Sequence, residues 1–249
     1  MIAADPWTEL RRHTAARIAL GRAGASLPTA EWLRFSLAHA LARDAVHLAY
    51  DNVALASTLA AMAFETLTVE SAAPDRSTYL RRPDLGRRLS PRCVGLLAAL
   101  RGTGCELAVV LGDGLSARAV HAHAAPLLQA LRPLLEAQGQ APVLIVLAHQ
   151  ARVALGDEVG ALLGAKALLM LIGERPGLSS PDSLGAYLTW APQPGRSDAE
   201  RNCVSNIRPE GLSHAEAAHK IAWLLGAARR LGVTGVALKD ESERALLPR

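Results

Sequence analysis

Long hydrophobic runs are absent from this 249-residue sequence, although half of its residues are hydrophobic. No stretch approaches the roughly 18 to 20 uncharged apolar residues that a membrane-spanning helix needs. The opening segment Met1–Trp7 has neither the basic nor the apolar region of a secretory signal. We therefore expect a cytoplasmic protein with no membrane partner, long enough to bury a sizeable core.

Cysteine and aromatic residues are also scarce. The three cysteines, Cys93, Cys105 and Cys203, lack C-x-x-C spacing, which argues against a disulfide framework and a zinc knuckle. Aromatic residues make up 4% of the chain and leave few platforms for stacking on single-stranded nucleic acid. The net charge of +4 comes from arginines scattered along the chain, so we expect no nucleic-acid partner.

Signatures of common catalytic and metal sites are missing as well. There is no G-x-S-x-G elbow, and no cysteine has an evident histidine partner in the sequence. His39 and His47 fall on one side of a predicted helix, but Arg43 lies between them and the H-E-x-x-H spacing is absent. We expect no metal site formed by protein side chains.

The hydrophobic pattern of the sequence differs between the first sixty or so residues and the rest of the chain. Helical spacing dominates the first sixty or so residues, where Thr29 can cap a helix and Leu41–Ala63 continues with few breakers. Further on, short apolar runs alternate with amphipathic helices, which is typical of βαβ units in a doubly wound, mostly parallel sheet of Rossmann or flavodoxin type. We predict an N-terminal helical arm over residues 1–63 and an α/β domain over residues 64–249.

The α/β pattern places individual elements. Four runs are predicted as parallel strands: Thr66–Glu70, Glu106–Leu111, Pro142–Leu147 and Ala167–Ile172, with helices near 89–101, 116–139 and 155–165. Two later runs, Tyr187–Trp190 and Cys203–Ile207, can add strands, and a helix over Ser213–Leu231 leads into Gly235–Leu238.

The first candidate site residue is Glu174. It follows the buried run Ala167–Ile172 directly, and ligands in open α/β sheets lie beyond the carboxyl ends of the strands. A carboxylate at that position can accept hydrogen bonds from a ligand, whereas an ion pair with Arg175 is the structural alternative.

Two further segments leave alternatives open. Gly112–Ala117 formally fits the G-x-G-x-x-G/A fingerprint and could bind a nucleotide such as NAD, but Asp113 would place a carboxylate near the pyrophosphate. A plain strand-to-helix turn is the favoured interpretation, and a turn that approaches some other large ligand is the third alternative. The second segment is a loop with arginines before and after Pro83–Gly86. It could grip a phosphate or an acidic surface, or form a solvated face. Its arginines are Arg81, Arg82, Arg87 and Arg88.

Several segments, in one order over nearly the whole chain, resemble the light chain of ethanolamine ammonia-lyase. They are Arg17–Gly24, Leu37–His39, Ala42–His47, Tyr79–Gly86, Leu111–Gly114, Arg152–Gly160, Leu171–Gly177, Ser183–Tyr187 and Arg201–Asn206. The resemblance implies a cobalamin-binding α/β domain in the small subunit of an adenosylcobalamin-dependent radical lyase. That enzyme converts ethanolamine to acetaldehyde and ammonia. The resemblance also implies a hetero-oligomer with a large barrel subunit, which carries the catalytic residues.

The same resemblance implies that Val153, Glu174 and Cys203 bind the cofactor. Without it, Cys203 would be interpreted as a small buried apolar residue and Val153 as a residue at a helix entry. The Arg81–Arg88 loop is expected to contact cofactor or partner. Many cobalamin domains carry Asp-x-His-x-x-Gly, whose histidine replaces the cofactor's own base on cobalt; that string is absent, so we expect cobalamin bound base-on. The family resemblance leaves open whether the complex is free in the cytoplasm or inside a bacterial microcompartment.

Overall fold

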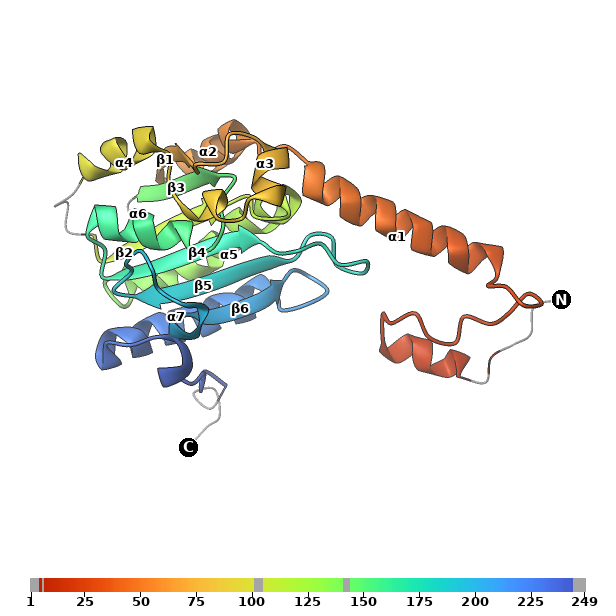
Figure 1. Cartoon of the computed structure of the whole chain (residues 1–249). Coiled ribbons are helices and arrows are strands. Elements are labelled where there is room, and N and C mark those ends of the chain that lie inside the picture. Colours follow the sequence, from red (N-terminus) through yellow and green to blue (C-terminus); the bar gives the residue numbers. More distant parts are fainter. Residues whose placement is uncertain (1–4, 6, 101–104, 141–143, 244–249) are drawn as a thin grey trace.

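The centre of the fold is a six-stranded sheet with the order β1-β3-β2-β4-β5-β6 (Figure 1). The computed structural model describes residues 5, 7–100, 105–140 and 144–243. The strands are β1 Glu65–Glu70, β2 Leu107–Gly112, β3 Leu144–His149, β4 Ala167–Gly173, β5 Leu184–Trp190 and β6 Asn202–Ile207. The strands β1 to β4 are mutually parallel, whereas β5 pairs antiparallel with both β4 and β6, so β6 runs in the same direction as the first four. The predicted mostly parallel sheet is confirmed; the first two residues of the predicted strand 142–147 lie outside the described residues.

Helices cover both faces of the sheet. One face packs against α2 Asn52–Ala61, α5 Ala117–Glu136 and α7 His214–Leu231, and the other against α4 Pro91–Ala98 and α6 Leu155–Leu163. This division follows from right-handed crossovers, because the connections β1 to β2 and β3 to β4 move one way along the sheet and the connection β2 to β3 moves back. The doubly wound α/β arrangement is therefore present.

Four short helices lie in the described part of the sheet domain. They are α3 Arg76–Arg81, η2 Leu85–Arg87, η3 Asp198–Glu200 and η4 Gly235–Ala237. The first two follow β1, the third lies between β5 and β6, and the last takes up most of the apolar segment 235–238. None of the helices in the described ranges is long and apolar enough to cross a membrane.

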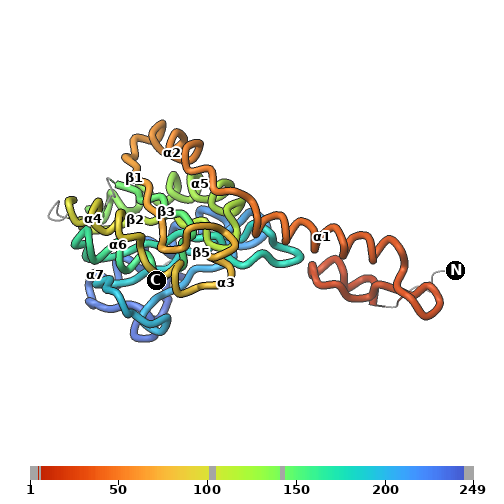
Figure 2. The backbone as a smooth tube through the Cα atoms, turned by 45° about the horizontal axis from the view of Figure 1, so that its top comes forward, coloured from red at the N-terminus to blue at the C-terminus, as the bar shows by residue number. Residues whose placement is uncertain are grey.

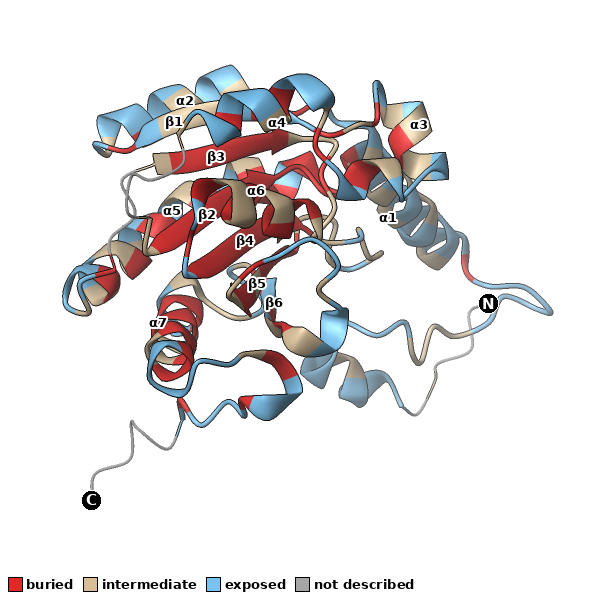
Figure 3. Ribbon diagram, turned by 60° about the vertical axis from the view of Figure 1, so that its left-hand side comes forward, coloured by how far each residue is buried: buried red, intermediate tan, exposed pale blue. Residues whose placement is uncertain are grey.

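The central strands β2 and β4 are buried along their whole length (Figure 3). Val109 and Leu111 belong to the core cluster that includes α5 and α7, whereas Ala108 and Val110 belong to the cluster that includes α4 and α6. Because both faces of these strands are covered, consecutive residues must all be apolar. This burial explains the uninterrupted apolar run of β4, which is the clearest strand signal in the sequence.

An N-terminal arm projects from the sheet domain in both views (Figures 1 and 2). It contains the 3₁₀ helix η1 Thr8–His13 and the helix α1 Thr29–His47, in which only Ala45 is buried. The helix starts at Thr29 itself after Pro28, without a side-chain cap, so the predicted capping role of Thr29 is wrong. The apolar side chains exposed along α1 are Trp32, Leu33, Phe35, Leu37 and Leu41.

The helix predicted to continue over residues 41–63 is present as two pieces, because the chain leaves helical geometry at Leu48 and resumes it at Asn52. One tertiary contact and one helix cap explain the break. The Tyr50 hydroxyl donates to the Leu111 carbonyl at 3.0 Å, and the Asp51 side chain caps α2. The helix α2 then packs on the sheet through Leu55 and Leu59. The arm boundary at residue 63 remains a prediction, since α2 contributes these side chains to the core of the sheet domain.

Candidate functional site

The candidate site lies where β2 and β3 end. These neighbouring strands lead into helices on opposite faces of the sheet, and such a divergence opens a crevice between the two strand-end loops. The Asp113 carboxylate bridges the loops: Oδ2 accepts from the Gln150 backbone N–H and Oδ1 from the Ala151 N–H, both at 3.0 Å. Asp113 therefore fixes the start of the loop that carries Val153.

Arg76, in α3, lies beside Asp113 on one side of the crevice. Its guanidinium lies 3.5 Å from Asp113 Oδ2 and donates to the carbonyls of Val46 and Gly114 at 2.7 Å. Burial raises the pKa of Asp113 above its usual range, while the hydrogen bonds from the Ala151 and Gln150 N–H groups and the charge of Arg76 oppose that shift.

Tyr79 is the central aromatic residue of the site. The guanidinium carbons of Arg76 and Arg152 lie 4.8 and 4.3 Å from its ring centroid, and its hydroxyl donates to the Ala151 carbonyl at 3.0 Å. The contact between its guanidinium and the buried Tyr79 ring sets the position of Arg152. Gly86 is needed here because a Cβ at that position would lie 2.9 Å from Arg152 Cγ.

A cavity of about 410 Å³, which we name the strand-end cavity, opens beside Tyr79. It lies beyond the carboxyl ends of β2 and β4. Its lining is Tyr79, Gly114, Leu115, Arg152, Val153, Ile172, Gly173, Glu174, Arg175 and Tyr187. The structure thus brings together two of the three sequence-predicted site residues, Val153 and Glu174, in one cavity.

Glu174 is held by hydrogen bonds to Ser183, just before β5, and to the edge strand β6, rather than by an ion pair. Its carboxylate accepts from the Ser183 hydroxyl, from the Ser205 hydroxyl at 2.7 Å and from the Asn206 backbone N–H at 3.2 Å. Arg175, which is described and exposed, forms no ion pair with it. Oε1 carries one of these bonds and Oε2 two, so one acceptor position of Oε1 remains open.

Val153 and Cys203 occupy different positions relative to the cavity. Val153 is half-buried in the turn before α6 and packs against the core. Cys203 lies on the edge strand β6, outside the cavity lining, where it pairs with the cavity residue Tyr187. Desolvation raises the pKa of the Cys203 thiol, and a hydrogen bond from Tyr187 opposes that shift. Cys203 forms no disulfide, and the residue as a whole is exposed.

The turn over residues 112–117 packs against β4 and does not present an open phosphate cradle. A Cβ on Gly114, whose φ is +56°, would lie 2.2 Å from the Gly173 carbonyl oxygen. The Leu115 N–H donates to that same carbonyl at 2.9 Å, and the Ser116 N–H donates to the Asp113 carbonyl. Because these donors already have protein partners, the geometry favours a structural turn over a nucleotide site.

A second cavity, of about 880 Å³, adjoins the first through Arg152 and Val153, which line both. We name it the arginine groove. Its lining is Arg87, Arg88, Arg152, Val153, Ala154, Glu158, Pro194, Gly195, Arg196, Ser197, Asp198 and Arg201. The structure thereby divides the arginine loop seen in the sequence: Arg87 and Arg88 face the groove, whereas Arg82 forms a 2.7 Å ion pair with Asp84.

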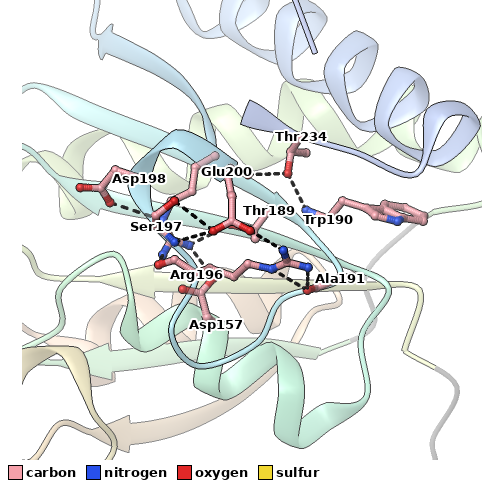
Figure 4. Close-up of polar contacts among 10 residues, drawn as sticks. Asp157, Thr189, Trp190, Ala191, Arg196, Ser197, Asp198, Glu200 and Thr234 are labelled. Carbon is pink, nitrogen blue, oxygen red and sulfur yellow. Dashed lines mark hydrogen bonds and ion pairs between the residues drawn. The ribbon is translucent and has the colours of Figure 1, made fainter. Parts of the chain in front are cut away.

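One wall of the arginine groove is a network between β5 and β6 (Figure 4). The buried Arg201 guanidinium lies 2.6 Å from the buried Asp157 carboxylate and donates to Thr189 Oγ1 at 3.1 Å. Arg196 pairs with Glu200 and donates to the Ala191 carbonyl at 3.0 Å. These contacts hold residues 191–201 against α6.

The comparisons with known proteins agree over nearly the full chain. The sequence profile of the ethanolamine ammonia-lyase light chain matches residues 4–239. An ethanolamine ammonia-lyase small subunit from Azotobacter vinelandii is 57% identical over 246 residues, covering 98% of this chain and 91% of the relative. The chain belongs to the ethanolamine ammonia-lyase light-chain family.

Other relatives with the same name give the same result. The small subunit from Bradyrhizobium diazoefficiens is 58% identical and that from Xanthomonas campestris 56% identical, with at least 90% of each relative covered. Family membership makes this chain a subunit of an ammonia-lyase and confirms the resemblance seen in the sequence. Within the described residues, no group of three or more histidines, cysteines or acidic residues is placed to hold a metal.

Sequence reasoning missed Arg76 as a site residue and did not single out Tyr79 or Arg152. Tyr79 and Arg152 open two of the segments that carry the family resemblance, and this was the available signal. Arg76 precedes those segments and has no sequence pattern of its own. Its role depends on Asp113, which lies 37 positions further along the chain.

Proposed function

We propose that this chain holds one side of adenosylcobalamin in an ethanolamine ammonia-lyase, while a large barrel subunit covers the other side and binds ethanolamine. When bound, this cofactor supplies the radical chemistry through homolysis of its cobalt–carbon bond. The residues of this chain position the corrin and exclude water. The observation that carries the proposal is the strand-end cavity, in which Val153 and Glu174 meet in a chain of this family.

The polar atoms of the cavity fit an amide-rich, phosphate-bearing cofactor. Arg152 lines the cavity, and its buried Nε has no hydrogen-bond partner among the described residues. A bound acceptor would remove the cost of that unpartnered donor. Glu174 offers the complement, since its open acceptor position can take a hydrogen bond from a corrin amide.

The apolar side chains of the cavity serve the same ligand. Val153, Leu115 and Ile172 line it beside the polar groups and can pack against the corrin edge. We assign Cys203 to the rim of this surface, because it lies beside Tyr187 on the adjacent strand. All three predicted cofactor residues thus lie on or next to one surface, where a large ligand could reach them together.

We further propose that cobalamin stays base-on. All eight histidines lie in the described part of the chain, and none of them lines the strand-end cavity. Electron paramagnetic resonance of cob(II)alamin in the complex tests this point. Nitrogen-15 labelling of the protein's histidines should leave the axial superhyperfine pattern unaltered; a changed pattern would identify a protein imidazole as the cobalt ligand.

The proposed activity is tested by co-expressing this chain with its large partner and measuring acetaldehyde release from ethanolamine. Release should require adenosylcobalamin and both chains. The isolated chain should be inactive and prone to association, because half of a shared site leaves apolar surface uncovered. Substantial deamination by the isolated chain with cobalamin would contradict the proposal. We propose a cytoplasmic complex, and fractionation of the cells distinguishes free enzyme from enzyme inside a microcompartment.

A further inference from the structure

The arginine groove has cationic groups that the chain itself does not neutralise. Five arginines line it, from the segment after α3, the turn before α6 and the connection between β5 and β6. Arg196 and Arg201 are engaged by Glu200 and Asp157 and form part of the wall (Figure 4). The other three have no carboxylate partner within the described residues.

Each of these three arginines is available in a different way. Arg87 and Arg88 are exposed and form no ion pair or side-chain hydrogen bond in the described structure. Arg152 is half-buried over the Tyr79 ring and marks the inner end of the groove; its unpartnered Nε is assigned to the cofactor, so Arg87 and Arg88 are the groups left for a partner. They therefore present a row of charge that runs from solvent to the edge of the strand-end cavity.

The carboxylates of the groove do not offset this charge. Glu158 Oε2 accepts the Leu89 backbone N–H at 2.7 Å, a bond that ties α6 to the arginine loop. Asp198 lies on the opposite wall, 3.5 Å from Arg201 Nε, and its side chain is 99% exposed. Neither is paired with Arg87, Arg88 or Arg152.

We propose that the arginine groove is a docking surface for acidic side chains of the large subunit. The proposal rests on the proposed function, because it identifies what covers the surface next to the cofactor. Arg152 and Val153 belong to both cavities, so the groove adjoins the surface that the large subunit is proposed to cover. Guanidinium groups in a fixed wall match carboxylates through paired hydrogen bonds.

The exposure of Arg87 and Arg88 favours a polypeptide over a small anion as the ligand of the arginine groove. A free phosphate is bound tightly where several buried donors converge, whereas Arg87 and Arg88 stand at the solvent-facing side of a broad groove. Charged groups at the rim of an interface mainly raise the association rate and give it a steep dependence on salt. Both properties can be measured on the complex.

The test uses the two-chain complex with Arg87→Glu/Arg88→Glu in this chain. Association with the large chain should weaken by at least about tenfold at low ionic strength, and its dependence on salt should become shallower. The matched control is Arg118→Glu/Arg230→Glu, which changes the net charge equally at exposed arginines outside the groove and outside the arginine loop. Sedimentation velocity across a salt series measures association, and circular dichroism verifies that each variant is folded.

The outcomes separate this inference from the proposed function. Weakened association only in the groove variant supports the docking surface. Equal association of wild type, control and groove variant at every salt concentration overturns it while the proposed function stands. If wild-type chains form no complex at all, both fail. Tight binding of inorganic pyrophosphate to the isolated chain, lost in Arg87→Glu/Arg88→Glu while the complex is unaffected, would assign the groove to a small anion instead.

Discussion

Asp113 holds Gln150 in a left-handed backbone conformation. The Gln150 φ is +53°, which side chains other than glycine rarely adopt, and its N–H donates to Asp113 Oδ2 at 3.0 Å. The next N–H, of Ala151, donates to the other carboxylate oxygen. One buried carboxylate thus sets the turn that delivers Arg152 and Val153 to the cavity.

We predict that Asp113→Asn lowers the free energy of unfolding by about 3 kcal/mol. An amide can accept from only one of the two N–H groups, and the change also leaves the Arg76 cation without its buried counter-charge. Urea unfolding followed by circular dichroism measures the loss. Stability equal to wild type would show that the turn holds its shape without Asp113.

Gly86 and Gly95 provide a matched pair of glycine-to-alanine substitutions. Gly86→Ala should cost about 1 to 3 kcal/mol and weaken cobalamin retention, because the new Cβ would displace Arg152 from its place over Tyr79. Gly95 lies in α4, and a Cβ added there would meet no atom within 4 Å, so Gly95→Ala should stabilise by about 0.5 to 1 kcal/mol. Opposite signs in thermal unfolding are expected; a neutral Gly86→Ala would contradict the crowding argument.

Glu174→Ala should weaken cobalamin retention more than folding. Loss of one charge-assisted hydrogen bond corresponds to about 1.5 to 3 kcal/mol, or roughly ten- to more than hundredfold in affinity. Equilibrium dialysis of the two-chain complex against hydroxocobalamin measures this, with Glu136→Ala as the control, which removes an exposed carboxylate outside the strand-end cavity. Since Glu174 also bonds Ser183 and Ser205, unchanged affinity with a large fall in melting temperature would identify it as purely structural.

His123 should make the fold less stable in mild acid. Desolvation lowers its pKa, as does His214 with its Nε2 3.2 Å away, while Asp182 and Glu210 oppose the shift. The unfolded chain takes up a proton on this imidazole near pH 6.5, and the folded chain only at lower pH. Its contribution is therefore fully present above about pH 6.5 and is lost as pH falls toward the folded-state pKa.

The measurement is the slope of unfolding free energy against pH between about pH 5 and 7. His123→Gln should flatten that slope relative to wild type, whereas His13→Gln, at an exposed position in the arm, should leave it unchanged. Identical slopes in all three proteins would remove His123 as a source of the acid sensitivity.

Periodicity identified the strands because burial on both faces leaves an unmistakable apolar run, as in β4. It gave no direction for the two later runs, so the antiparallel pairing of β5 with β4 and β6 was not predicted. The break near Leu48 was missed because no Gly or Pro marks it, and the contact of Tyr50 with Leu111 joins residues 61 positions apart.

The site was accessible to sequence reasoning only in part. The strand-end rule placed Glu174, but its partner Ser205 comes from another strand. Val153 and Cys203 were named from family resemblance. From the residues alone, each has an ordinary structural interpretation, as a residue at a helix entry and as a small buried apolar residue. The stacking of Arg76 and Arg152 on Tyr79 joins α3 to the turn before α6, and Arg152 lies 73 positions beyond Tyr79, so the contact has no local pattern.

The most direct test of the central claim is the cobalamin absorbance that remains with protein after gel filtration. Samples are the large chain alone, the large chain with this chain, and the same pair with Val153→Arg, which places a charged side chain in the strand-end cavity. Retention should appear only when wild-type chain is present and should fall sharply in the variant complex, whose assembly is verified in the same run. Full retention by the large chain alone, or by the variant complex, would contradict a cofactor site on this chain.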